Sequence, residues 1–295
     1  MFHLLKWVGL FGFLALVLPV VAEEEIATFK VWNSKTKSYG NVSEILLQAE
    51  GYDVVIWGEE HDDAEGHKAQ LDFFKKFTFG FPKVTLSLEM LEKDQQLILD
   101  EYVKNIIPER QLLSGSSHWK NFASDYFPLV KHAKESSSFV VCANPPRRYV
   151  NAVARKGMNA YSDFSNEVHH WIPEAHTLGQ NISPVYQIKL SSMFQVDHSQ
   201  DPKVSSNMPS PENMILAQFM WDQGMAESIS REVYRSGRKV LHLNGRFHSD
   251  DEGGVAYRLK KMGHKVLVLS VFPEGKEEEG NFSKLGDFVI LTKSR

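Results

Sequence analysis

The sequence predicts an α/β fold in which helices flank a mostly parallel central sheet. Six short segments are rich in Val, Ile, Leu and Phe, and their apolar runs are nearly continuous, as in strands covered on both faces. Helical patterns separate most of these segments, which favours parallel strands joined by right-handed connections. The six predicted strands are residues 54–57, 84–88, 139–143, 240–244, 266–271 and 288–291.

The helices are predicted from their apolar periodicity and their end signals. His67, Leu71 and Phe74 stand at positions i, i+4 and i+7, which is one face of a helix. Pro211 suits the first turn of a long helix, and Gly237 suits its end. The predicted helices are residues 64–77, 93–104, 125–136, 147–156, 211–236 and 255–262.

Residues 158–210 do not fit the alternation, because prolines and polar residues interrupt the pattern. We interpret this stretch as a proline-broken helical insertion or lid over one face of the sheet. It contains His169, His170, His176 and His198, four of the 12 histidines. A His-rich segment can bind a metal or haem, but the same residues also suit an exposed loop.

The first 22 residues resemble a secretory signal. Lys6 precedes an apolar run over residues 8–21, and small residues precede a cleavage point after Ala22. An uncleaved membrane anchor is the alternative, but a spanning helix needs about 20 apolar residues. We therefore expect a signal peptide over 1–22, a single domain over 23–295 and an exported mature form without a stable membrane span. In a bacterium this means the periplasm or cell envelope, and the absence of a cysteine near the cleavage point argues against a lipoprotein.

Composition excludes several classes of protein. The chain has 37 acidic and 33 basic residues and a net charge of -4, which does not favour nucleic-acid binding. With 42% hydrophobic and 24% charged residues it has the composition of a globular protein. Cys142 is the only cysteine, so no intrachain disulfide and no CxxC metal site can form.

Polar residues follow four of the predicted strands. Because the carboxyl ends of parallel strands share one edge of a sheet, we expect these residues to converge there. The candidate site residues are Glu59, His61, Glu89, Arg147 and His248, with Asn144 beside Arg147.

This set allows more than one chemistry. Glu59, His61, Glu89 and His248 offer oxygen and nitrogen ligands for a divalent transition metal such as Zn, Fe or Mn. Arg147 is suited to a carboxylate or phosphate of a ligand. Without a metal, a carboxylate beside either histidine would orient the ring for general-base work on water.

Five sequence elements together resemble the ChaN-like haem-binding uptake domain of the Tiki superfamily, from about residue 29 onward. They are Val54-Val55-Ile56-Trp57-Gly58-Glu59-Glu60-His61 with His67 and Gln70, Leu88-Glu89-Met90, Ala143-Asn144-Pro145-Pro146-Arg147, Ala217-Gln218-Phe219-Met220-Trp221-Asp222 with Met225-Ala226, and Gly245-Arg246-Phe247-His248. The resemblance implies an α/β fold with a cleft formed by these loops, and a role in haem or iron acquisition at the cell envelope. It adds His67, Gln70, Asn144 and Asp222 as candidate cofactor-binding residues.

Two functions remain open from the sequence. The first is an exported module that binds haem, within one protomer or between two protomers of a homodimer, with His61, His248, Tyr149 or Tyr257 as candidate axial ligand. The second is a metal-dependent or His/Glu-based hydrolase of an ester or amide, because the carboxylate and imidazole groups expected at one edge of the sheet exceed what haem ligation requires. The resemblance also implies relatives in the superfamily that are hydrolases, such as the erythromycin esterases and the Tiki metalloproteases. An inactive member that only binds a partner is a third possibility.

Overall fold

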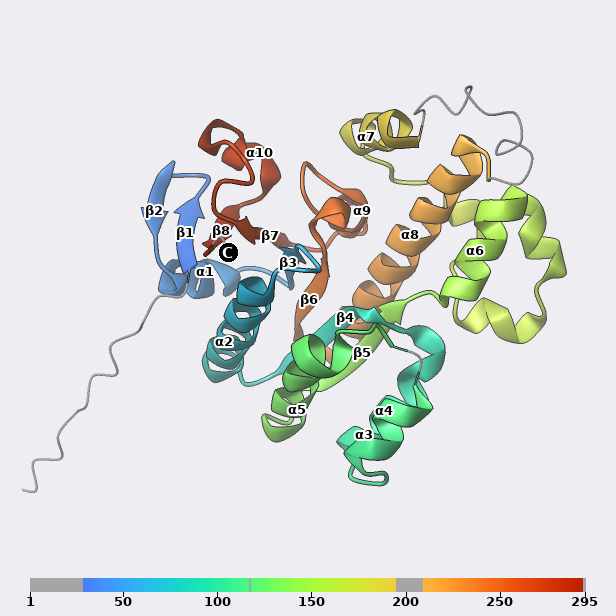
Figure 1. Cartoon of the computed structure of the whole chain (residues 1–295), viewed down its shortest axis with the longest axis horizontal. Coiled ribbons are helices and arrows are strands. Elements are labelled where there is room, and N and C mark those ends of the chain that lie inside the picture. Colours follow the sequence, from blue (N-terminus) through green and yellow to red (C-terminus); the bar gives the residue numbers. More distant parts are fainter. Residues whose placement is uncertain (1–28, 117, 195–208, 294–295) are drawn as a thin grey trace, which may run out of the picture.

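A sheet of eight strands forms the centre of the protein (Figure 1). The computed structural model describes residues 29–116, 118–194 and 209–293, so the expected signal peptide at 1–22 lies outside the described residues. The strand order is β2-β1-β8-β7-β3-β6-β4-β5. The strands are β1 (Phe29–Asn33), β2 (Ser38–Gly40), β3 (Val54–Glu59), β4 (Val84–Glu92), β5 (Phe139–Asn144), β6 (Lys239–Gly245), β7 (Val266–Pro273) and β8 (Phe288–Thr292).

The six predicted strands are all present and pair in parallel, which confirms the predicted fold class. The sequence prediction missed the hairpin of β1 and β2, which adds to β8 in the antiparallel direction. This hairpin is short and half-exposed at one end of the sheet, so it lacks the continuous apolar run of the central strands.

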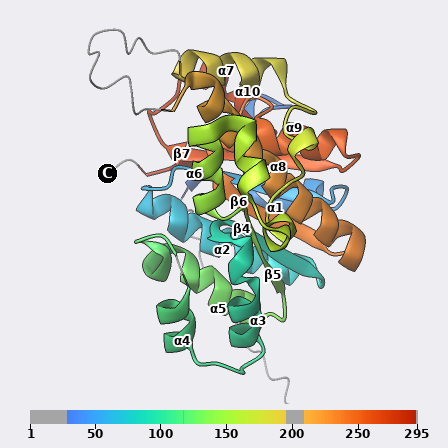
Figure 2. The same ribbon diagram turned by 90° about the vertical axis from the view of Figure 1, so that its right-hand side faces the viewer.

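Helices cover both faces of the sheet. The larger core cluster packs α1, α2, α3 and α5 against one face, and α8 and α9 cover the other. In Figure 2, α3, α4 and α5 lie below the strands, whereas α7 and α9 lie above them. The helices are α1 (Val42–Ala49), α2 (Ala64–Gly80), α3 (Gln96–Val103), α4 (Glu109–Gly115), α5 (Phe127–Glu135), α6 (Arg147–Lys156), α7 (Pro184–Phe194), α8 (Pro211–Ser236), α9 (Gly254–Lys261) and α10 (Phe282–Leu285).

The ends of α8 show why its bounds were predictable. Ser210 is the N-cap and its hydroxyl accepts a hydrogen bond from the Asn213 amide at 3.3 Å, while Pro211 occupies the first turn. Gly237 ends the helix in the left-handed region at φ 61°, where glycine has no steric cost.

The predicted insertion is a series of short 3-10 turns followed by α7. Its turns are η3 (Gly157–Asp163), η4 (Asn166–His170) and η5 (Ala175–Thr177). Their apolar side chains form a third core cluster with α6 and α8. The insertion is therefore packed onto the helical layer, and its residues His198 and Pro202 lie outside the described residues. Within the described part of the chain, no helix is both long and apolar enough to cross a bilayer.

Candidate functional site

Glu59, the last residue of β3, is the centre of a hydrogen-bonded cluster on the α2 side of the sheet. It is 3% exposed, and it accepts hydrogen bonds from Gln70 Nε2 at 2.5 Å, from the Tyr126 hydroxyl and from His61 Nδ1 at 3.0 Å. His67 lies beneath it, with Nδ1 3.7 Å from Glu59 Oε2 and Nε2 donating to the His61 carbonyl at 3.2 Å. This cluster fixes the orientation of the His61 ring.

Glu89, near the end of β4, belongs to a second cluster on the α8 side. Its Oε2 accepts the Gly245 amide at 2.7 Å, and its Oε1 lies 3.8 Å from His248 Nε2. His248 Nδ1 donates to Oδ1 of the fully buried Asp222 of α8 at 2.6 Å. Burial alone would lower the pKa of His248, but the charges of Glu89 and Asp222 outweigh it and raise that pKa to about 9. His248 is therefore an imidazolium at neutral pH.

Gly245, the last residue of β6, joins the two clusters. Side chains alternate along a strand, so Glu59 faces α2 while Glu89 faces α8. Glu89 accepts a hydrogen bond from the Gly245 amide, and a Cβ on residue 245 would stand 2.6 Å from His61 Nε2. Residue 245 therefore has no room for a side chain, because the His61 ring packs closely against it.

A pocket of about 530 Å³ opens in front of His61. Phe247 and Leu285 supply apolar surface, and Lys189 of α7 stands 4.6 Å from the centre of the Phe247 ring. The Arg246 guanidinium is paired with two acids, and it donates to Asp250 at 2.7 Å and to Glu277 at 3.0 Å. The remaining residues that line the pocket are Glu59, Glu60, Gly245, Asp251, Asn281 and Lys284.

The structure brings together four of the five residues expected to converge. Burial lowers the pKa of His61, but its hydrogen bond to Glu59 and the charge of Glu89 outweigh it and raise that pKa. Since Glu89 also contacts His248 and the Gly245 backbone, Glu59, His61, Glu89 and His248 form one continuous group.

Arg147 does not join this group, which corrects the expectation that it would. Arg147 is the first residue of α6 and follows the edge strand β5, which lies three positions from β3 in the sheet order, or about 14 Å at about 4.8 Å per strand. Arg147 is exposed and lines a separate pocket with Asp94 and Arg148. Asn144, expected to bind a cofactor, is buried at the end of the same edge strand.

The other expected cofactor-binding residues lie behind the pocket. His67, Gln70 and Asp222 are buried at 5%, 1% and 0% exposure. Gln70 and Asp222 hydrogen-bond to Glu59 and His248 respectively, so they position those side chains.

The structure gives the expected metal site no support. Across residues 29–116, 118–194 and 209–293, no group of three or more His, Cys, Asp or Glu side chains is arranged to hold a metal ion. The physical reason is that Glu59 and Glu89 point to opposite faces of the sheet and already accept hydrogen bonds from protein donors. The expected Zn, Fe or Mn site at Glu59, His61, Glu89 and His248 is therefore not supported.

Sequence reasoning missed Tyr126 and Lys189. Tyr126 ends a π-helical turn, η2 (Phe122–Tyr126), immediately before α5, and nothing in the local pattern separates it from the core aromatics around it. Lys189 belongs to α7, in the predicted helical insertion, where the sequence pattern did not indicate individual helices.

Fold and site define a class: a parallel α/β protein with a ligand pocket and buried carboxylate–histidine pairs at the carboxyl edge of its sheet. The family model described as haem-binding uptake, Tiki superfamily, ChaN, matches residues 45–259. Because this match covers most of the chain, the protein belongs to that family.

The chain is similar to several solved structures. The structure of ChaN of Campylobacter jejuni with cofacially bound haem is 18% identical, has a TM-score of 0.66, and is matched over 90% of this chain and 97% of that chain. The type III effector HopBA1 is 12% identical with a TM-score of 0.48, over 86% of this chain and 94% of that one. The erythromycin esterase EreC is 13% identical with a TM-score of 0.48, over 89% and 83% of the two chains. A comparison with curated proteins found no match.

Proposed function

We propose that this protein binds haem in the pocket in front of His61. Membership of the haem-binding uptake family is the observation that carries this proposal. The solved ChaN structure, which holds haem, supports it through the shared fold.

His61 is the best placed of the four candidate axial ligands. Its side chain is 42% exposed, its Nδ1 is hydrogen-bonded to Glu59, and its Nε2 has no hydrogen-bond partner among the described residues. A carboxylate on one ring nitrogen is the usual arrangement for a histidine whose other nitrogen binds a metal. His248 is nearly buried between Asp222 and Glu89, and Tyr149 is packed between Phe164 and Trp171.

The rest of the pocket suits the chemistry of haem. Phe247 and Leu285 offer apolar contact to the macrocycle, and Lys189 and Lys284 offer cations for its propionates. The volume of about 530 Å³ lies within the range of about 300–1,000 Å³ typical of small-molecule sites. Haem held there would supply an iron centre that His61 would coordinate through Nε2.

The proposal includes export and a role in haem or iron uptake. Its support is the signal-like pattern of residues 1–22 together with the family description. Because the pocket is open, one protomer would cover one face of a haem, and a second protomer in a homodimer would cover the other.

A haemin titration of the protein from residue 23 onward tests the proposal. We expect a saturable shift of the Soret band, which His61→Ala abolishes or weakens at least tenfold. His176→Ala is the matched control, because this histidine belongs to the insertion and lies outside the pocket. A flat titration, or loss of binding in the His176 variant alone, would contradict the proposal.

A hydrolase lacks comparable support. A general base must be unprotonated near the working pH. Burial lowers the pKa of His248, but its carboxylate neighbours Glu89 and Asp222 outweigh that effect and raise the pKa to about 9.

A further inference from the structure

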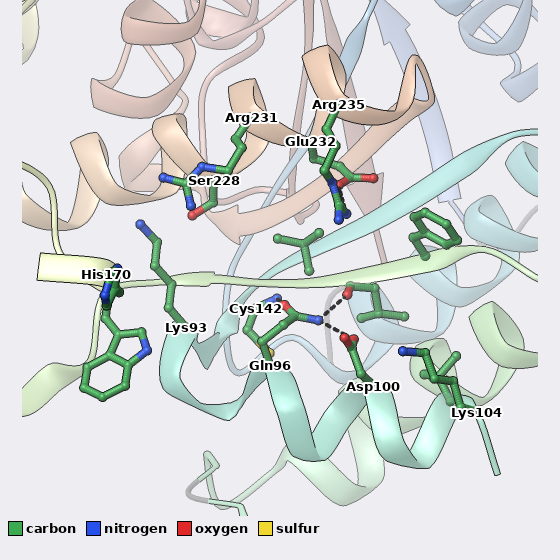
Figure 3. A pocket seen from close by; sticks show the side chains of 15 residues that line it. Lys93, Gln96, Asp100, Lys104, Cys142, His170, Ser228, Arg231, Glu232 and Arg235 are labelled. Atoms are coloured by element: carbon green, nitrogen blue, oxygen red, sulfur yellow. Dashed lines mark hydrogen bonds and ion pairs between the residues drawn. The ribbon is translucent and has the colours of Figure 1, made fainter. Parts of the chain in front are cut away.

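A second pocket, of about 500 Å³, runs along the outer side of β5 between α3 and α8 (Figure 3). It shares no lining residue with the pocket in front of His61. We call it the β5 pocket. Its apolar lining, which we call the floor, comes from Val103, Phe139, Val140, Val141, Cys142 and Trp171.

Positive charge exceeds negative charge around the β5 pocket. Four cations, Lys93, Lys104, Arg231 and Arg235, line it against two acids, Asp100 and Glu232. Both acids already have partners, since Asp100 accepts from Gln96 at 2.8 Å and Glu232 accepts from Thr85 at 3.0 Å and from Arg235 at 2.6 Å. A local excess of cations in a chain of net charge -4 favours an anionic ligand.

Lys93 is the cation best placed to bind such a ligand. Its side chain reaches from the start of η1 (Lys93–Gln95) across β5 toward Ser228 and Arg231 (Figure 3). Among the described residues it has no hydrogen bond or ion pair. Burial lowers the pKa of Lys93 to about 8, an effect that the Glu227 carboxylate opposes and the Arg231 guanidinium increases. A bound anion would relieve the repulsion between the two cations.

Gln96 prevents a peptide strand from occupying the β5 pocket. Its Nε2 donates to the Val140 carbonyl at 2.9 Å, and its Oε1 accepts the Cys142 amide at 2.8 Å. These are the groups that an added strand would use, so the edge of β5 is already paired at its centre. The space that remains suits a small molecule.

We infer that the β5 pocket binds a small amphiphilic organic anion, with an aromatic or aliphatic body on the apolar floor and a carboxylate or phosphate between Lys93 and Arg231. The site is separate from the proposed haem site. The inference gives a ligand class to the β5 pocket, which has no part in the proposed haem uptake.

Calorimetric titration with naphthyl phosphate and naphthoate tests this inference. We expect saturable binding of at least one of the two anions, and their relative affinities distinguish phosphate from carboxylate recognition. Lys93→Met and Arg231→Met each remove one charge-assisted contact, so each should weaken binding by about tenfold or more. Lys35→Met is the matched control, because Lys35 is an exposed lysine in the hairpin at the opposite end of the sheet.

Haemin titrations of the same variants keep the two sites apart. We expect the Lys93→Met and Arg231→Met variants to give the same haemin titration as the unmodified protein. This expectation holds even if the unmodified protein does not bind haemin. The inference is overturned if neither anion binds saturably, if both variants bind the anions normally, or if neutral naphthalenemethanol binds equally well. Loss of haemin binding in both variants would also overturn it, because the pocket would then belong to the haem site.

Discussion

His61 and His248 differ at the residue scale in what surrounds each ring. Both histidines face carboxylates, but the His61 side chain is 42% exposed and its Nε2 has no hydrogen-bond partner among the described residues, whereas His248 has acids near both nitrogens. The first arrangement suits a ligand-binding imidazole, and the second suits a fixed positive charge that holds Glu89 and Asp222 in place. The His61 ring can occupy its position because Gly245 has no side chain, since a Cβ there would stand 2.6 Å from Nε2.

Gly245→Ala should therefore weaken haem binding. The backbone at φ -58° accepts alanine, so the effect comes from the new Cβ, which would stand 2.6 Å from His61 Nε2. We expect at least a tenfold loss of haemin affinity, and a stability loss of about 1–3 kcal/mol from overpacking. Gly80→Ala is the control, because a Cβ there meets nothing within 4 Å. Equal haemin affinity in both variants would contradict the role given to Gly245.

The charge of His248 should make stability depend on pH. Burial lowers the pKa of His248, but Glu89 and Asp222 raise it from 6.5 to about 9, so the folded state binds this proton more tightly than the unfolded state. The stabilisation is complete below about pH 6.5 and is lost as pH rises through about 9, with an upper bound of about 3 kcal/mol. Denaturation at several pH values measures this loss, and NMR titration of the ring measures the pKa.

Asp222→Asn provides the comparison for that experiment. It removes one of the two charges that raise the pKa of His248, so the ring should titrate closer to its ordinary value. The loss of stability between pH 6.5 and 9 should shrink accordingly. An unchanged pKa of His248 in this variant would show that Asp222 does not raise the pKa of that ring.

Strand β5 shows, at the scale of the element, how an exposed edge is protected. The side-chain amide of Gln96 pairs with the Val140 carbonyl and the Cys142 amide, as a neighbouring strand would. Unpaired strand edges promote association between chains, so this pairing serves solubility as well as stability.

Gln96→Ala should destabilise the protein and favour self-association. The two hydrogen bonds contribute about 1–3 kcal/mol together, and their loss exposes the edge of β5. Chemical denaturation and light scattering measure the two effects. Gln187→Ala, at an exposed position of α7, is the control and should change neither. If the Gln96 variant remains as stable and as monodisperse as the control, the pairing of Gln96 with β5 does not protect the edge of the sheet.

The elements also differ in how well their structure could be predicted from the sequence. The buried strands were predictable because a strand covered on both faces must be continuously apolar, as Val54–Glu59 shows. The convergence of Glu59, His61, Glu89 and His248 followed from parallel topology alone. The error at Arg147 has the same origin, since strand ends were predictable but the strand order, which places β5 at the edge, was not.

At the scale of the whole molecule, the insertion connects to both the helical layer and the haem pocket. Its turns pack on α6 and α8, and its helix α7 brings Lys189 to the pocket and Tyr186 against Phe247, with ring centres 5.5 Å apart. Proline interruptions and polar residues concealed this from sequence reasoning, because its stability comes from contacts distant in the chain.

Arg258 of α9 is the side chain that should hold the insertion in place. It is 1% exposed and donates to the Gln180 carbonyl at 2.7 Å and to the Leu178 carbonyl at 2.8 Å. Arg258→Met keeps the length of the side chain but leaves these carbonyls without their donor, at a cost of about 1–3 kcal/mol for each buried group. We expect faster hydrogen exchange in residues 157–194 and weaker haemin binding, because Lys189 and Tyr186 would lose their fixed positions. Arg235→Met, at a position 67% exposed in its side chain, is the control and should leave exchange in the insertion unchanged. If the Arg258 variant loosens the entire sheet equally, the insertion is part of one cooperative unit and does not move independently.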